Sequence, residues 1–151
     1  LHKRANVAYF GTFGYELDLN KLSYEEISEV KQQIAFMKEY RELIQFGTFY
    51  RLKSPFEGNE TAWMTVSEDK KTALVFWYRE RNVVNADFTR VRLQGLDPDF
   101  IYRNEYNGTE NYGDELMNLG LLTTDCTAGE PTSEDEPCTD YESRIYVLTA
   151  K

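Results

Sequence analysis

The sequence predicts a mainly β fold, an antiparallel β-sandwich over residues 47–151 that follows one strand–helix unit over residues 1–46. Three observations lead to this prediction. Residues 24–46 have the periodicity of one long helix, the chain after Gly47 divides into short strand-like runs, and turn-forming residues separate these runs. Short strands at such spacing are typical of a sandwich or a barrel.

The first element that we expect is a strand over residues 5–10, Ala-Asn-Val-Ala-Tyr-Phe. A short and mostly apolar run of this kind is typical of a strand that is buried on both faces, as in a parallel sheet. A glycine-containing loop over residues 11–14 follows it. Because the strand comes directly after residues 1–4 without a leader-like segment, we expect the chain to be a piece of a longer protein.

The helix signal over residues 24–46 is the strongest in the sequence. Ser23 can cap its N-terminus and Glu26, three residues later, completes a capping box, while Gly47 is a natural stop. Apolar residues form two neighbouring stripes along this helix: Ile27, Val30, Ile34, Met37 and Ile44 in one, and Phe36, Tyr40 and Leu43 in the other. A helix that is apolar over so wide an arc needs cover from two sides.

Strands are expected over most of the remaining chain. Their predicted ranges are residues 48–53, 61–67, 72–81, 88–94, 101–106, 115–122 and 144–149. Asn107-Gly108 is a strong hairpin signal between two of them. The acidic stretch 123–141 contains two prolines and no strong apolar residue, so we expect a mobile surface loop there.

The charge of the chain restricts its partners. Its formal net charge is −9, from 17 basic and 26 acidic residues. A surface of this sign repels phosphate groups, so we expect no nucleic acid and no anionic membrane as a partner. No run of about 18 apolar residues is present to span a membrane. A neutral ligand such as a sugar is compatible with this charge.

Two cysteines, Cys126 and Cys138, lie in the acidic stretch. We expect them to be thiols in a cytoplasmic protein, since no secretory feature is present. The alternative is a disulfide that closes a short loop.

Few residues have a pattern typical of catalysis or of metal binding. His2 is a lone histidine without a nearby partner, and no spacing of metal ligands occurs, so we assign no metal and no cofactor. Glu16 and Asp18 flank Leu17 just before the long helix. They are either an acid/base pair at the mouth of a barrel strand or, as we favour, solvated groups and ligands of loop amides.

Four aromatic residues, Trp63, Phe76, Trp77 and Tyr78, are the other candidate. An exposed Trp on a sandwich could stack on a sugar ring. Trp77 and Tyr78 are adjacent in a strand, so their side chains point to opposite faces. We therefore favour core packing or a domain interface for this group.

Residues 7–19, VAYFGTFGYELDL, resemble the segment that closes the catalytic barrel of family-36 α-galactosidases. Other segments match that family in order along nearly the whole chain: residues 34–36, 38–41, 43–52, 62–64, 66–67, 95–99, 112–118 and 143–148. The stretch 123–141 departs from the pattern, because it is longer and more acidic than we expect for the family.

The resemblance implies a parent enzyme with an N-terminal β-sandwich, a (β/α)₈ barrel and a C-terminal antiparallel β-domain. This chain would hold the last strand and the last helix of the barrel (residues 1–46) and the C-terminal β-sandwich (residues 47–151). The catalytic aspartates of the family lie in Lys-Trp-Asp-type and Ser-Asp-containing stretches of earlier barrel strands, and neither stretch occurs here. We therefore assign no catalytic residue to this chain, and we expect Phe10, Gly11, Thr12 and Phe13 to lie at the rim of the parent's pocket.

The function that the resemblance implies is retaining hydrolysis of terminal α-linked galactose in melibiose- or raffinose-type sugars, in the cytoplasm, with a structural part for this segment. Its partners would be the rest of the parent barrel, a galactoside in the full-length enzyme and further copies of itself in a homo-oligomer. Two alternatives stay open. One is a carbohydrate-binding β-sandwich module, and the other is a protein-interaction domain that docks through the helix stripes.

Overall fold

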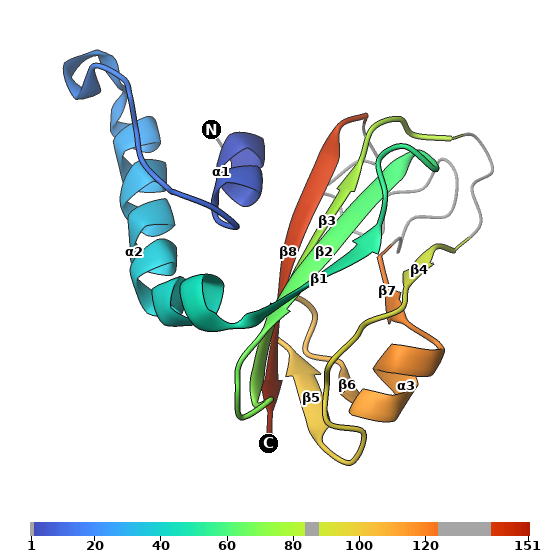
Figure 1. The fold of residues 1–151 in the computed structure, drawn as a ribbon. Coiled ribbons are helices and arrows are strands. Elements are labelled where there is room, and N and C mark those ends of the chain that lie inside the picture. The colour runs from blue at the N-terminus through green and yellow to red at the C-terminus, as the bar shows by residue number, and fades with distance from the viewer. Residues whose placement is uncertain (1, 84–87, 124–139) are drawn as a thin grey trace.

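A computed structural model describes residues 2–83, 88–123 and 140–151 of the chain. Its largest feature is an antiparallel sheet of six strands in the order β1-β2-β3-β8-β5-β6 (Figure 1). Cys126, Cys138 and most of the acidic stretch 123–141 lie outside the described residues, so the predictions for them stay untested.

The sheet begins with a meander of three strands. These are β1 (Thr48–Lys53), β2 (Glu60–Val66) and β3 (Thr72–Arg79). Strand β8 (Glu142–Ala150) pairs with the outer edge of β3, with Trp77 opposite Arg144. Strands β5 (Ile101–Asn104) and β6 (Glu110–Tyr112) complete the sheet as a hairpin, and the predicted Asn107-Gly108 turn lies between them, with Gly108 at a φ of 71°.

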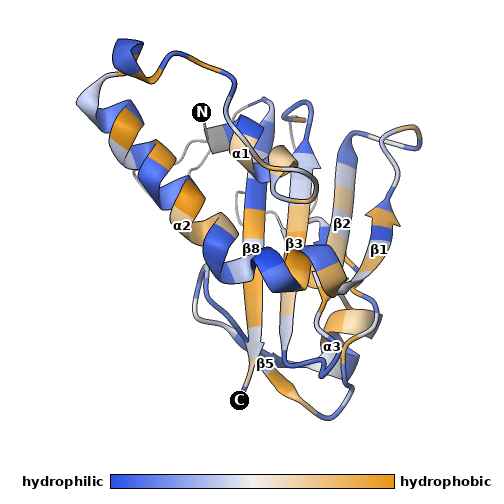
Figure 2. Cartoon of the chain, turned by 60° about the vertical axis from the view of Figure 1, so that its left-hand side comes forward, coloured by the Kyte–Doolittle hydropathy of each residue, from blue (hydrophilic) through white to orange (hydrophobic). Residues whose placement is uncertain are grey.

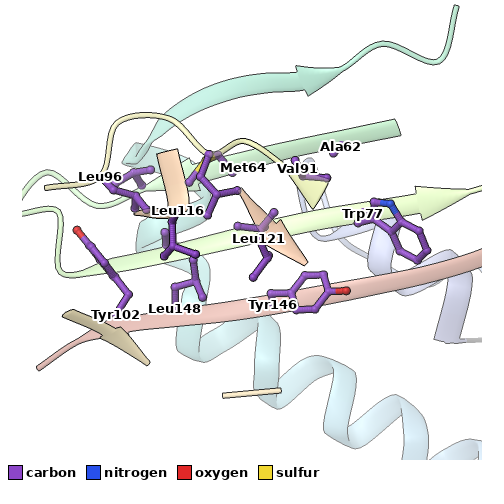
Figure 3. Packing of buried hydrophobic residues seen from close by; sticks show 14 residues of the cluster. Ala62, Met64, Trp77, Val91, Leu96, Tyr102, Leu116, Leu121, Tyr146 and Leu148 are labelled. Atoms are coloured by element: carbon purple, nitrogen blue, oxygen red, sulfur yellow. The ribbon is translucent and has the colours of Figure 1, made fainter. Parts of the chain in front are cut away.

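A smaller second layer covers one face of the sheet. It consists of the two-stranded pair β4 (Arg90–Val91) and β7 (Leu121–Leu122) with the short helix α3 (Gly113–Asn118). The main hydrophobic core lies between the two layers (Figure 3). Its sheet residues alternate along each strand, as expected for one buried face: Ala62, Met64, Val66, Ala73, Val75, Trp77, Tyr102, Tyr146 and Leu148. The antiparallel, mainly β fold with two layers is thus confirmed.

The long helix forms where it was predicted. Helix α2 spans Tyr24–Phe46, and Ser23 and Glu26 make both hydrogen bonds of the capping box, at 3.2 and 2.8 Å. Gly47 ends the helix, and its amide donates to the Leu43 carbonyl at 2.9 Å. Hydrophobic and hydrophilic bands alternate along the length of α2 (Figure 2). Most residues of the two predicted apolar stripes are only half-buried, whereas Val30 and Met37 are buried.

Residues 5–10, predicted to be a strand, are not one. Helix α1 occupies His2–Ala8 instead. Ala5 and Tyr9, four residues apart, are both buried, while Val7 between them is exposed, which is the pattern of a helix face. The short apolar run fits either periodicity, and tertiary packing selects the helix. The buried Asn6 amide holds α1 to the sheet by donating to Ser143 Oγ at 3.0 Å.

Two other strand predictions were wrong in part. Residues 115–122 were predicted as one strand, but they divide between α3 and the two residues of β7. Asp114 and Glu115 lie in the first turn of α3, where negative side chains interact favourably with the helix dipole. Gly120, at a φ of 94°, separates α3 from β7 with a left-handed backbone conformation. The predicted strand 88–94 is reduced to the two residues of β4, and β6 was not predicted.

Helices α1 and α2 lie on the face of the sheet opposite to the second layer, with α1 between α2 and the strands (Figure 1). A second apolar cluster joins Ala5 of α1 and Tyr9, which follows α1, to Met37 of α2 and Ile145 of β8. Of the helices described, none is both long and apolar enough to cross a membrane.

Candidate functional site

The segment of residues 11–18 connects α1 to the short 3-10 helix η1 (Leu19–Lys21) and runs alongside α2 (Figure 1). Residues 12–16 belong to no helix and pair with no strand among the described residues. Their exposure nevertheless alternates: Phe13 and Tyr15 are half-buried against the helices, and the residues on either side of them are exposed. This is the period of an extended strand with one covered face.

Aromatic rings fix this covered face. The ring of Phe13 stacks on Tyr9, the residue that follows α1, with centroids 5.0 Å apart, and it packs edge-to-face with Tyr15 at 5.3 Å. Tyr9 also contacts Phe36 of α2 at 4.6 Å. Phe10 turns the other way, toward Trp63 and the sheet, at 6.0 Å. Phe13 and Tyr15, which are two residues apart, therefore hold the segment against the two helices.

A polar chain lies beside the rings. The Tyr15 hydroxyl donates to Gln33 Oε1, and the Gln33 amide donates to Glu29 Oε1 at 2.9 Å. Gln33 is buried on α2. Burial, together with the nearby Tyr15 and Glu29, raises the pKa of Tyr9 to about 12. The tyrosines therefore stay neutral over the physiological range and act as packing groups and hydrogen-bond donors.

The structure separates the two candidate carboxylates. Asp18 caps η1, where its Oδ1 accepts from the Asn20 amide at 3.1 Å, and it lies 3.8 Å from the Lys21 ammonium group. This is the loop-amide role that we favoured for the pair. Glu16 is exposed and makes no hydrogen bond or ion pair with any described residue. The two groups therefore do not act together as a pair in this structure.

The four residues expected at a pocket rim also separate. Gly11, Thr12 and Phe13 line an open hollow of about 480 Å³ against α2, whose lining from the helix includes Met37 and Lys38. Phe10 is not part of it, because its ring packs toward Trp63 and Phe76. Among the described residues that line this hollow there is no carboxylate, and therefore no paired acid and base.

The aromatic candidates of the sheet are packing residues. Trp77 is fully buried in the main core (Figure 3), and the guanidinium groups of Arg79 and Arg144 lie 5.4 and 5.9 Å from its ring. Phe76 is buried on the opposite face and stacks on Trp63 at 4.2 Å. Trp63 and Tyr78 are half-buried. The four rings therefore do not form an exposed platform for a sugar, and Phe76 and Trp77 pack in the interior.

The loop predicted over residues 11–14 is confirmed, because the structure has no helix or strand there. Sequence reasoning missed the alternating exposure of residues 12–16, although Thr-Phe-Gly-Tyr-Glu alternates aromatic with small or polar residues. That alternation was the available signal. It also missed the Tyr15–Gln33–Glu29 chain, for which a buried glutamine on an apolar stripe gives no sequence signal. Residues 2–83, 88–123 and 140–151 contain no cluster of three or more His, Cys, Asp or Glu side chains that could hold a metal ion.

Two family models cover most of the chain. Residues 1–47 match the model described as Melibiase, and residues 60–148 match that of the glycosyl hydrolase family 36 C-terminal domain. The chain belongs to glycosyl hydrolase family 36. The resemblance seen in the sequence is thus confirmed, and the junction between the two matches falls where α2 passes into the sheet.

Curated relatives of this family-36 chain are α-galactosidases. It is 52% identical to alpha-galactosidase AgaA of Geobacillus stearothermophilus over 121 residues, which are 80% of the chain and 16% of the relative. It is 43% identical to alpha-galactosidase 1 of Pediococcus pentosaceus over 147 residues, 97% of the chain and 19% of the relative. The chain therefore spans less than a fifth of the length of these relatives.

Solved structures agree with the sequence comparison. The crystal structure of AgaA superposes with a TM-score of 0.85 at 44% identity, over 98% of this chain and 19% of that one. The α-galactosidase from Lactobacillus brevis gives a TM-score of 0.86 at 40% identity, over 98% and 20%. The mainly β fold with its helical N-terminal unit is thus the arrangement found in family-36 enzymes.

Proposed function

We propose that this chain is the C-terminal segment of a retaining α-galactosidase, in which it supplies the last strand and helix of the catalytic barrel and the C-terminal β-domain. The observation that supports this best is the order of the two family matches, barrel-type over residues 1–47 and C-terminal domain over residues 60–148. The domain boundary would lie at Gly47, where α2 ends and β1 begins.

The barrel strand in this proposal is residues 12–16. The segment precedes the long helix α2, has one face on the helices, and has no neighbouring strand among the described residues. In a (β/α)₈ barrel each strand receives its hydrogen bonds from the strands beside it and is followed by a helix that packs on its outer face. The expectation of a rim at residues 10–13 assumed a strand over residues 5–10. With the strand at 12–16, the same reasoning moves the rim to residues 16–18.

The reaction would be hydrolysis of terminal α-linked galactose with retention, on melibiose- or raffinose-type sugars. Relatives carry the name alpha-galactosidase, and AgaA variants have been crystallised with raffinose and with stachyose. Retaining hydrolysis needs two carboxyl groups about 5 Å apart across the sugar. We assign neither group to this chain, whose part is to close the barrel wall and to pack against it. A cytoplasmic location and a homo-oligomeric parent complete the proposal.

A direct test joins this chain to the part of AgaA that precedes the matching segment. We expect the chimera to hydrolyse nitrophenyl α-galactoside and raffinose, and the isolated chain to give no turnover above the buffer rate. An inactive but folded chimera would contradict the proposal, as would turnover by the isolated chain. The unmodified AgaA serves as the positive control for expression and assay.

A further inference from the structure

We propose that Glu16 is a substrate-binding residue, whose carboxylate accepts hydrogen bonds from hydroxyl groups of the galactosyl unit. The inference rests on the proposed function, since it uses the placement of residues 12–16 as a barrel strand. It assigns one side chain of this segment to the sugar pocket, although the reacting carboxylates lie elsewhere.

The face on which Glu16 lies follows from the contacts of its neighbours. Phe13 and Tyr15 face α1 and α2, and Phe13 belongs to the apolar cluster between these helices. Thr12, Gly14 and Glu16 are exposed. Because side chains of a strand alternate between its two faces, we place these three residues on the face opposite to Phe13 and Tyr15. In a (β/α)₈ barrel the face opposite to the helices is the interior of the barrel.

Glu16 lies near the C-terminal end of the proposed strand, which sets its position along the axis of the barrel. Thr12 and Gly14, the earlier inward positions, are small and leave room for side chains from other strands. Glu16 is the last inward residue before Asp18 and η1 end the segment. Active sites of such barrels lie at the C-terminal ends of the strands, which is the end where Glu16 is placed.

The negative charge of Glu16 makes its burial in a barrel unfavourable without a partner. An ionised carboxylate without a partner is strongly disfavoured in a packed barrel core, so this side chain needs either water, a ligand or a cation. Asp18 already has the Asn20 amide and Lys21. Glu16 has no hydrogen bond or ion pair with any described residue, so its oxygen atoms are available to a ligand.

The chemistry fits a neutral sugar. A carboxylate only accepts hydrogen bonds when ionised, and it can accept from two adjacent hydroxyl groups. Hydrogen bonds to a charged acceptor are stronger than those between neutral groups. A galactosyl unit offers several adjacent hydroxyl groups. Because it is neutral, the negative net charge of the chain does not repel it.

The experiment uses the active chimera with AgaA. We expect Glu16→Gln to lower kcat/KM for raffinose by roughly 10- to 100-fold and to weaken inhibition by free galactose to a similar degree. The thermal midpoint of the Glu16→Gln chimera should stay unchanged. The Glu16→Asp chimera, which keeps a carboxylate, should have an affinity between those of the Glu16→Gln and unmutated chimeras. Glu42→Gln, which removes an exposed carboxylate from the outer face of α2, is the matched control and should change neither measurement.

Three results would overturn the inference. A lower thermal midpoint with unchanged kinetics would show that Glu16 forms a structural ion pair with another barrel strand. No change in either measurement would show that the side chain is idle in solvent. An unmutated chimera that folds without activity would reject the proposed function and this inference with it, whereas the first two results leave the proposed function intact.

Discussion

Tyr102 shows how one hydroxyl group can connect three parts of this chain. Its side chain is buried in the main core, but its hydroxyl donates to the Lys70 carbonyl at 2.6 Å and accepts from the Asp97 amide at 2.9 Å. Lys70 lies in the turn between β2 and β3 and has a φ of 57°, which is uncommon for a residue other than glycine. The hydroxyl therefore stabilises an unfavourable turn and the entry to the β5–β6 hairpin.

We expect Tyr102→Phe to lower the free energy of unfolding by about 1–3 kcal/mol, because it leaves a carbonyl and an amide without their partner. Urea unfolding of the isolated chain would measure this change. Tyr112→Phe is the matched control, since Tyr112 is a half-exposed tyrosine of β6, and it should alter the value by less than about 0.5 kcal/mol. Equal effects of the two substitutions would contradict the role given to Tyr102.

At the scale of elements, the junction between α2 and β1 depends on Gly47. Its φ of −66° is open to any residue, so the constraint is space and not backbone freedom. A Cβ atom at this position would lie 2.6 Å from Thr65 Oγ1 and 2.8 Å from the Val66 carbonyl oxygen. Thr65 also donates to the Leu43 carbonyl at 3.1 Å, so helix and sheet are in direct contact here.

Gly47→Ala should therefore destabilise the chain by about 1–3 kcal/mol through overpacking. Gly58→Ala is a suitable control, because nothing lies within 4 Å of its Cβ position, and we expect it to be neutral or slightly stabilising. Chemical denaturation of both variants gives the comparison. If the two alanine variants were equally stable, the close approach of α2 to β2 would not be a constraint in solution.

Elements with strong local signals could be predicted from the sequence. The capping box at Ser23 and the stop at Gly47 gave α2 its bounds, and β1 and β2 lie within a residue of their predicted ranges. Short apolar runs could not be assigned in this way. Residues 5–10 fit a strand and a helix equally well, and the choice depends on contacts of Asn6 and Tyr9 with distant parts of the chain.

The candidate site was less predictable than the fold. The sequence identified Glu16 and Asp18 as notable carboxylates. It could not show that Asp18 caps η1 and that Glu16 has no hydrogen bond or ion pair with a described residue. That distinction depends on the direction of the backbone after Tyr15, which no local pattern fixes.

On the scale of the whole molecule, apolar residues remain uncovered on the helical unit. Leu19 and Phe46 are 55% and 81% exposed, and Tyr24 at the start of α2 is 88% exposed. Contiguous apolar patches larger than a few hundred Å² are rare on monomeric soluble proteins and mark interaction sites. In the proposed parent this surface would be covered by the remaining barrel.

We expect the isolated chain to dimerise through residues 5–46, with an average mass that rises with concentration in light scattering. The double substitution Leu19→Lys and Phe46→Lys should reduce this association, because it places charge on the uncovered surface. The control is Phe56→Lys with Phe88→Lys, which changes two exposed aromatic residues outside that unit. A monomer at all concentrations, or equal effects of both pairs, would contradict the prediction.

The place of β8 between β3 and β5 has a consequence for biosynthesis. During translation the meander β1–β3 leaves the ribosome with the edge of β3 bare, and it stays bare until residues 142–150 have been made. Throughout that interval the nascent polypeptide exposes a row of unpaired amide and carbonyl groups beside large apolar side chains, which is a template for aggregation. A premature stop codon anywhere before residue 142 would leave the two halves of the sheet unjoined, so chaperone binding and proteolysis are the expected fate of such a product.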